Sequence, residues 1–139
     1  MCGEDSSKNY LIAINSANRG SGTYNDFRIV MPFNTVVRKV ALVGLQMTLP
    51  AAGNGCVGIK IRELPTPCKI ASSSSESFTT FLVLCSGSNL QWSESSEFSQ
   101  EVVCNESSLG ELNITVVDNS GAKIAINTDW SMVLRVEGV

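Results

Sequence analysis

The sequence predicts an all-β protein, a two-sheet antiparallel sandwich of about eight strands, and three observations lead to that prediction. Apolar runs are short and rich in Val, Ile and Leu, and turn-forming residues (Gly, Pro, Asn, Asp, Ser) separate them. Several runs alternate apolar and polar residues, as half-buried strands do. No segment has the helical periodicity that the crossovers of a parallel α/β fold require.

The first two strands are predicted near the N-terminus. Residues 10–15 (Tyr-Leu-Ile-Ala-Ile-Asn) read as a strand, and residues 16–26 are rich in Gly, Ser and Asn, which is typical of a loop. Residues 27–31 then alternate Phe, Ile and Met with other residues. Because proline has no N–H to donate to a ladder, we expect Pro32 to end this second strand.

The middle of the chain supplies the most apolar segment. Residues 36–48 are apolar on both faces, which predicts a central strand that is covered on both sides or lies at a subunit contact. We therefore expect residues 36–47 to include side chains buried between subunits. Residues 50–55 break this strand, and the alternation of Val57, Ile59 and Ile61 predicts the next one.

Four more segments have strand character. Residues 78–85 are apolar, and residues 98–104 form a shorter and more polar segment. Residues 112–117 alternate, residues 118–121 (Asp-Asn-Ser-Gly) have turn chemistry, and residues 123–126 (Lys-Ile-Ala-Ile) return as a strand. Residues 112–126, two strand segments joined by a turn, therefore predict a β-hairpin.

The last strand has the clearest pattern. Trp130, Met132, Leu134 and Val136 fall on one face of residues 130–136, and mostly polar residues fall on the other. This predicts a half-buried antiparallel strand at the end of the chain.

The length of 139 residues fits one domain. We expect a short polar N-terminal arm at residues 1–8 and a single domain at residues 9–139. Among antiparallel sandwiches, a single jelly roll is the first choice.

Charge and composition exclude several function classes. Ten Lys and Arg against thirteen Asp and Glu give a net charge of −3, and no basic cluster occurs, so nucleic-acid binding is not expected. The chain has no His, which removes the imidazole base of Ser-His and Cys-His catalysis and the commonest neutral metal ligand. Apolar runs are too short for a membrane-spanning helix, and the polar N-terminus does not resemble a secretory signal.

Five cysteines occur, without a Cys-x-x-Cys pair, at positions Cys2, Cys56, Cys68, Cys85 and Cys104. Their number and spacing favour reduced thiols in a cytoplasmic setting over a disulfide framework or a zinc site. No metal or cofactor is therefore predicted.

Four acids close in sequence, Glu94, Glu97, Glu101 and Glu106, are the candidates for carboxylate catalysis. With aromatic residues at only 6% there is little to form a sugar cleft, so solvated loop acids are the favoured interpretation. No enzyme motif occurs, and no catalytic residue is predicted.

A carbohydrate- or ligand-binding sandwich module is the alternative function, because Tyr24, Trp92 and Trp130 could stack on sugar rings. Trp130 shares the apolar face of the last strand and is predicted to lie in the core, which leaves two rings in loops. Residues 18–22 could hold an anion through backbone amides, but no helix follows them, so we interpret them as a plain connection.

The two ends of the chain resemble a known family. Residues 10–27 (strand, Ser/Asn/Arg loop, strand) and 40–50, together with residues 112–124 and 130–136, are similar to single jelly-roll minor capsid and penton (vertex) proteins of large double-stranded DNA viruses. Residues 53–111 match nothing in that pattern.

The resemblance implies a viral structural protein without catalytic residues. Such a subunit would build an icosahedral shell by self-association, with a pentamer among the candidate states. It would also contact the major capsid protein and neighbouring minor capsid proteins. It would be made in the host cytoplasm and located in the virion capsid.

Overall fold

A computed structural model describes residues 9–49, 54–71, 76–95 and 100–138. These residues form ten strands and one 3₁₀ helix, and every strand pairing is antiparallel. In chain order the elements are β1 (Asn9–Asn15), η1 (Ser16–Asn18), β2 (Ser21–Thr23), β3 (Asp26–Thr48), β4 (Asn54–Ile61), β5 (Cys68–Ala71), β6 (Glu76–Thr79), β7 (Phe81–Ser86), β8 (Asn89–Ser93), β9 (Gln100–Val117) and β10 (Ser131–Gly138).

The strand pairs are nested along the sequence. The innermost pair is β5 with β6, and β4 pairs with β7 outside it. Residues 44–48 of β3 then pair with β8, residues between 26 and 42 of β3 with β9, and β1 with β10. The chain is therefore one long antiparallel ribbon whose first half runs beside its second half.

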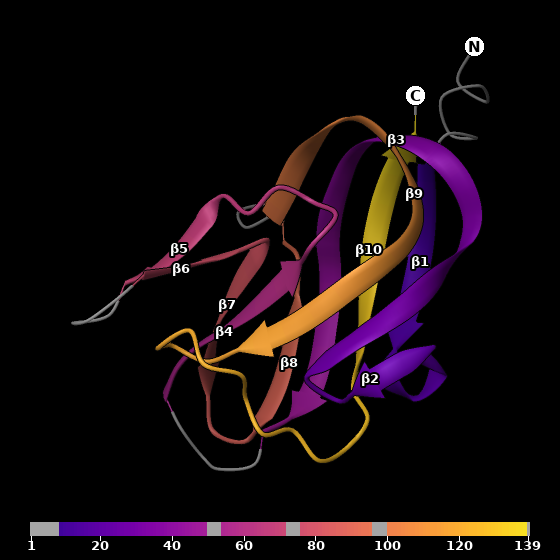
Figure 1. The fold of residues 1–139 in the computed structure, drawn as a ribbon. Coiled ribbons are helices and arrows are strands. Elements are labelled where there is room, and N and C mark those ends of the chain that lie inside the picture. Colours follow the sequence, from indigo (N-terminus) through magenta and orange to yellow (C-terminus); the bar gives the residue numbers. More distant parts are fainter. Residues whose placement is uncertain (1–8, 50–53, 72–75, 96–99, 139) are drawn as a thin grey trace.

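Two further ladders roll this ribbon into two layers. They join β10 to β3 and β4 to β9. The first layer has the order β1, β10, residues 39–48 of β3, and β8; the second has residues 26–30 of β3, then β9, β4 and β7 (Figure 1). The predicted all-β antiparallel sandwich is thus confirmed.

Inward-facing side chains of both layers form one core. Its largest fully buried members include Ile14, Leu42, Ile59, Phe81, Ile114 and Leu134. The period-two patterns read from the sequence hold: the four apolar side chains predicted to share a face of the last strand are all buried, while Ser131, Val133 and Arg135 are half-buried. Alternation therefore placed β1, β4 and β10 correctly.

Pro32 does not end the second strand, contrary to the prediction. β3 continues through it from Asp26 to Thr48. The reason is that the ladder to β9 is interrupted there: Val30 pairs with Glu111 and the next pair is Thr35 with Leu109. A missing N–H removes no ladder bond at such an irregularity, and the irregularity lets the strand pass from one layer to the other.

Most apolar residues of the segment 36–47 are buried within their own chain, and the predicted contact between subunits stays a prediction. Val40 and Leu42 face the core, and Ala41 on the other face is 2% exposed. In register Ala41 lies between Arg135 and Glu101, so longer neighbours on the outer face cover it. Val36, which is 41% exposed, is the apolar residue of this segment that stays available for a contact.

The predicted hairpin over residues 112–126 is wrong in its second half. Residues 118–121 do form the turn, but residues 123–126 make one isolated bridge, Val117 to Lys123. The end of β9 already has β3 on one edge and β4 on the other, since Thr115 pairs with both Asp26 and Lys60. Only Val116 and Val117 leave an edge to the returning chain, which makes the bridge at Lys123 and a hydrogen bond from the Ile124 N–H to the Val116 carbonyl (3.1 Å) and then runs on as a loop.

The segment predicted as one strand at residues 78–85 is divided at Thr80. Its backbone N–H donates to the Ile59 carbonyl (2.9 Å), and its hydroxyl accepts from the Ile61 N–H (3.0 Å). These bonds separate β6, which pairs with β5, from β7, which pairs with β4. The described part of the predicted segment at 98–104 is the start of the much longer β9.

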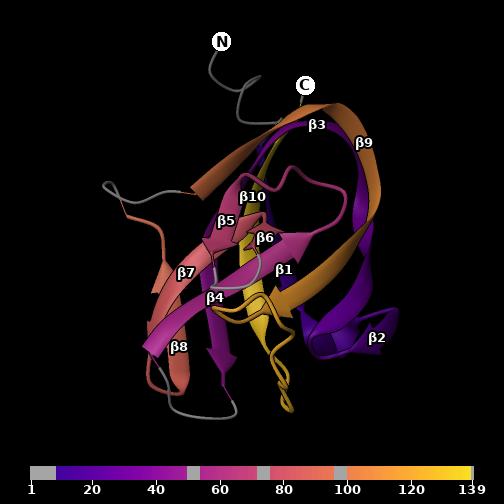
Figure 2. The same cartoon turned by 60° about the vertical axis from the view of Figure 1, so that its left-hand side comes forward.

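The hairpin of β5 and β6 lies over the second layer at Gly58 (Figure 2). A Cβ atom at Gly58 would stand 2.7 Å from Cγ2 of Thr79, 2.9 Å from Cγ2 of Val117 and 3.2 Å from Cδ1 of Ile70. Thr79 and Ile70 are buried, so the hairpin packs directly on the β4 backbone. This close approach requires glycine at position 58.

A Cβ atom at position 58 is therefore expected to destabilise the protein. Gly58→Ala should lower the free energy of unfolding by about 1–3 kcal/mol, because the β-branched neighbours cannot move away freely. Gly110→Ala is the matched control, since nothing lies within 4 Å of a Cβ atom there. Urea unfolding followed by tryptophan fluorescence measures both; equal effects at the two sites would contradict the packing argument.

Candidate interaction surfaces

An apolar groove runs along one lateral edge of the sandwich, between β1 and the first part of β3. Its volume is about 390 Å³. We call it the β1–β3 groove; it is lined by Leu11, Ile12, Ala13, Ile14, Asn18, Gly20, Ile29, Val30 and Met31. Strand alternation turns Ile12 and Ile14 inward and leaves Leu11 70% exposed, with Val30 65% exposed on the facing strand. Two exposed aliphatic side chains thus flank one groove.

The opposite lateral edge carries an exposed leucine. β7 ends the second layer there, and its Phe81 and Val83 face the core while Leu84 is 81% exposed. The free edge of β7 is closed at Leu82 by the side chain of Gln100, whose amide accepts from the Leu82 N–H (2.7 Å) and donates to the Leu82 carbonyl. A side chain thereby takes the place of a neighbouring strand, and Leu84 projects beside it.

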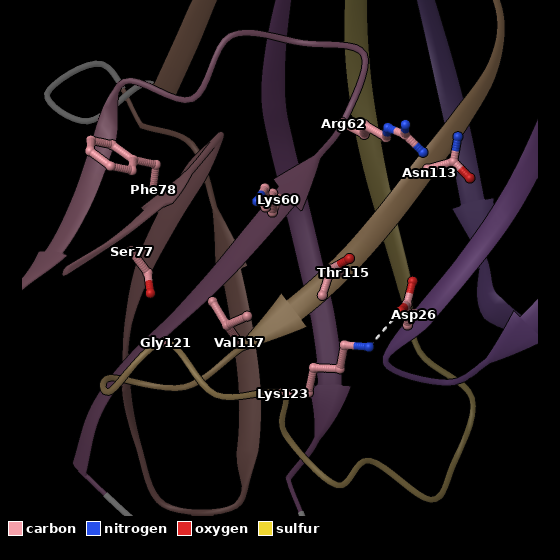
Figure 3. Close-up of a pocket in the computed structure, with 10 residues that line it drawn as sticks. All are labelled: Asp26, Lys60, Arg62, Ser77, Phe78, Asn113, Thr115, Val117, Gly121 and Lys123. Carbon is pink, nitrogen blue, oxygen red and sulfur yellow. Dashed lines mark hydrogen bonds and ion pairs between the residues drawn. The ribbon is translucent and has the colours of Figure 1, made fainter. Parts of the chain in front are cut away.

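A larger groove lies on the outer face of the second layer (Figure 3). Its volume is about 680 Å³. We call it the polar groove; its lining residues are Asp26, Lys60, Arg62, Ser77, Phe78, Asn113, Thr115, Val117, Gly121 and Lys123. β4 and β9 supply its floor, the β5–β6 hairpin one wall, and the turn after β9 closes one end.

Gly121 allows that turn to approach the hairpin. Its φ is +87°, a left-handed conformation that favours glycine. A Cβ atom there would also stand only 2.0 Å from Oγ of Ser77 on β6. Both the backbone conformation and the close contact therefore depend on glycine at this position.

Asp118 holds the same turn. Its Oδ1 accepts from the Ser120 N–H (2.8 Å), the Ser120 hydroxyl (2.7 Å) and the Ala122 N–H (3.1 Å). Burial alone would raise the pKa of Asp118, but these hydrogen bonds to the ionised form outweigh it and hold the pKa below its ordinary value. The charged carboxylate thus stabilises the end of the polar groove.

The charges of the polar groove are unevenly paired. Lys123 donates to Asp26 at 2.6 Å, so the lining carboxylate is neutralised (Figure 3). Lys60 on β4 and Arg62, which directly follows β4, are exposed, and neither forms an ion pair with another described residue. At the rim, the Phe78 ring is 42% exposed and lies 5.4 Å from Nζ of Lys69. The groove therefore has net positive charge.

The four acids considered for catalysis are placed differently. Glu94 forms an ion pair with Arg135, and Glu101 forms one with Lys39 at 3.7 Å. Glu97 lies outside the described residues, and the side chain of Glu106 is among those not described. Both acids whose side chains are described are therefore paired with a cation. Glu101 lies on β9 and not in a loop as predicted, and the side chain of Glu94 is only 23% exposed.

Of the three aromatic residues considered for stacking on sugar rings, Trp130 lies in the core and Trp92 is half-buried. Trp130 is 3% exposed, packs edge-on against Phe27 and donates from Nε1 to the Tyr24 carbonyl (2.7 Å), so its core role is confirmed. Trp92 lies on β8, not in a loop as predicted, and packs half-buried against the core.

Sequence reasoning missed three strands, β2, β5 and β8, because they are only three to five residues long.

The loop at residues 18–22 is a structural connection. Arg19 donates to the carbonyls of Ser16 (2.8 Å) and Gly22 (3.1 Å), and it lies 3.6 Å from the Asp129 carboxylate. Its guanidinium also lies 4.9 Å from the Tyr24 ring centre. These internal contacts fix the loop against the segment before β10.

The described cysteines, Cys56, Cys68, Cys85 and Cys104, are free thiols. Burial raises the pKa of Cys68 and of Cys104. The pKa of Cys56 is also raised, first by burial and then by the nearby Cys85 and Asp118. These three thiols are thus poor nucleophiles at neutral pH. Cys2 lies outside the described residues.

The described part of the chain has neither a metal-binding cluster nor a helix that could span a membrane. It contains no group of three or more Cys, Asp and Glu side chains placed to hold a metal ion. It also contains no helix of the length and apolarity needed to cross a membrane.

Comparison with known proteins yields a likeness to solved structures. No protein-family model and no curated protein matches the chain. Among solved structures, it is similar to the tripod (BppUct-A-L) from the baseplate of bacteriophage Tuc2009. The match has a TM-score of 0.44 and 14% identity, and covers 100% of this chain and 68% of the other. A likeness this weak carries no functional argument.

The depressed pKa of Asp118 predicts a pH dependence of stability. A carboxyl whose pKa is lower in the folded state stabilises the protein above the unfolded value, about 3.9, and this stabilisation is lost as the pH falls through the folded value. Asp118→Asn lacks this titration. Wild type should therefore be more stable than the variant at pH 7, and the difference should shrink below about pH 4.

Urea unfolding between pH 7 and pH 3 measures this difference, and a constant difference over that range would refute the prediction. Ser120→Ala provides the control, because it removes one donor to Asp118 and leaves the carboxyl in place. In that variant the pKa of Asp118, followed by NMR, should move upward toward its ordinary value.

Proposed function

We propose that the protein is a viral structural protein, a minor capsid or penton (vertex) subunit that acts by assembly. It would self-associate, with a pentamer as the expected ring, and contact the major capsid protein and neighbouring minor capsid proteins. Its place would be the virion capsid, after synthesis in the host cytoplasm. No catalytic residue, cofactor or metal is part of this proposal.

The nested pairing of the strands supports the jelly-roll part of the proposal. A jelly roll is a double-sheet antiparallel sandwich in which Greek-key connections place strands distant in sequence side by side. Here the first and last strands pair, β3 pairs with both β9 and β8, and β4 pairs with β7. The sequence resemblance at both ends of the chain points to the same architecture.

The observation that carries the proposal is the position of the exposed aliphatic side chains. Leu11 and Val30 flank an apolar groove on one lateral edge, and Leu84 projects from the opposite edge. A ring requires a heterologous contact, in which one patch of each copy meets a different patch of the next. An exposed leucine on one edge and an apolar groove on the other are suited to such a contact between copies.

Both edges are expected to contribute to self-association. Leu11→Asp and Leu84→Asp each place a charge in the contact, so each should weaken association at least tenfold. The two side chains are exposed, and the monomer should therefore stay folded. Light scattering over a range of concentrations, with reducing agent present, gives the mass. Val103→Asp is the matched control, because Val103 is 61% exposed and lines neither the β1–β3 groove nor the edge at β7.

Mixing the two variants tests the geometry of the contact. Leu11→Asp damages the groove and leaves Leu84 intact, and Leu84→Asp does the reverse. In a heterologous arrangement one intact groove and one intact leucine remain in each mixed pair, so the mixture should form dimers and no ring. A wild-type protein that is a strict monomer at all concentrations would contradict self-association.

A further inference from the structure

The polar groove has a chemistry that self-association at the lateral edges does not use. It lies on the outer face of the second layer, and its lining includes neither Leu11, Val30 nor Leu84. Its lining carries three cations and one carboxylate, and that carboxylate is already paired with Lys123. Lys60, near the end of β4, and Arg62, the first residue after β4, are left as two cations that line the groove. Such a pair is suited to a carboxylate-sized anion.

Neutral hydrogen-bonding groups stand beside these cations. Thr115 lies opposite Lys60 in the ladder between β4 and β9, and the Arg62 N–H donates to the Asn113 carbonyl. Glu63 accepts from both the backbone N–H (2.7 Å) and Nδ2 (2.6 Å) of Asn113, which fixes the amide of that side chain. Figure 3 shows Arg62 extending toward Asn113, with Thr115 further along the same strand.

The floor of the groove offers side chains and no free backbone edge. β4 is paired on one side with β7 and on the other with β9, and β9 is paired with β3 and β4. An extended peptide that binds by strand addition needs an unpaired edge, which is absent from these two strands. A compact ligand that is recognised by side chains fits this floor better than a peptide does.

The rim adds an apolar surface. The exposed Phe78 ring on β6 lines the groove at the wall opposite Asn113 (Figure 3). Aromatic rings pack on the C–H face of a sugar, while hydroxyl groups take amide and hydroxyl partners. The volume of about 680 Å³ lies in the range usual for small-molecule sites, about 300–1,000 Å³.

We infer that the polar groove binds a sugar acid. Lys60 and Arg62 take its carboxylate, Asn113 and Thr115 take its hydroxyl groups, and Phe78 covers one face of the ring. This site differs from the one that the aromatic residues Tyr24, Trp92 and Trp130 suggested in the sequence. The inference is independent of self-association, and the site is complete within one chain.

NMR titration of the labelled protein with trigalacturonate tests the inference. The expected result is saturable shifts at residues 60–62, 77–78 and 113–115. The Lys60→Gln/Arg62→Gln double variant should bind at least tenfold more weakly. Arg38→Gln/Lys39→Gln is the matched control, because it also removes two cations but lies outside the groove. It should bind as wild type does.

Three further probes separate the alternatives. Neutral galactose should bind much more weakly than trigalacturonate, since it lacks the carboxylate. Phe78→Ala should weaken trigalacturonate binding and leave the affinity for inorganic sulfate unchanged. Sulfate or a tetraglutamate peptide binding as tightly as trigalacturonate would overturn the inference, in favour of a general anion site or a peptide site. Equal losses in the double variant and its matched control would overturn it too.

Discussion

The pairing of β3 with β9 is the constraint on which the rest of the structure depends. These two long strands pair from Asp26–Thr115 at one end to Leu42–Gln100 at the other, and both take part in both layers. A shift of this ladder by one residue would turn Phe27, Val40 and Ile114 out of the core together. The register is therefore fixed by burial on both layers at once, and β2, β4, β8 and β10 each pair directly with one of these two strands.

The irregularities of that ladder are as important as its regular parts. The register shifts between Val30 and Thr35, and again between Val37 and Lys39. A strand bends and twists more strongly at such points, which allows β3 to leave the second layer and enter the first without a loop. Pro32 lies at the first of them, where its missing N–H does no harm and its restricted backbone fits a bend.

Sequence patterns were sufficient for the parts of the fold that local alternation determines. The buried faces of β1, β4 and β10 follow from period-two patterns, and so does the antiparallel sandwich. The errors at Pro32 and at residues 123–126 have a different origin, because the outcome there depends on which edges distant strands already occupy. The polar groove was missed for the same reason: Arg62, Phe78 and Asn113 come together only when the ribbon rolls up. Gly58 and Gly121 mark the close contacts around this groove, but which residues they contact depends on neighbours far along the chain.

The two surfaces of the molecule lie on different sides, and this has a consequence for affinity. The β1–β3 groove and Leu84 occupy the lateral edges, whereas the polar groove opens on the outer face of one layer. Edge-to-edge assembly would leave every polar groove accessible, and the rotational symmetry of a ring would present all of them in the same orientation. Several weak sites on one rigid ring bind a repeating ligand far more tightly than a single site does, provided that the ligand spans them. A sugar-acid site of low affinity in the monomer would then act through the assembly, so the edge contact and the groove would together set the strength of binding.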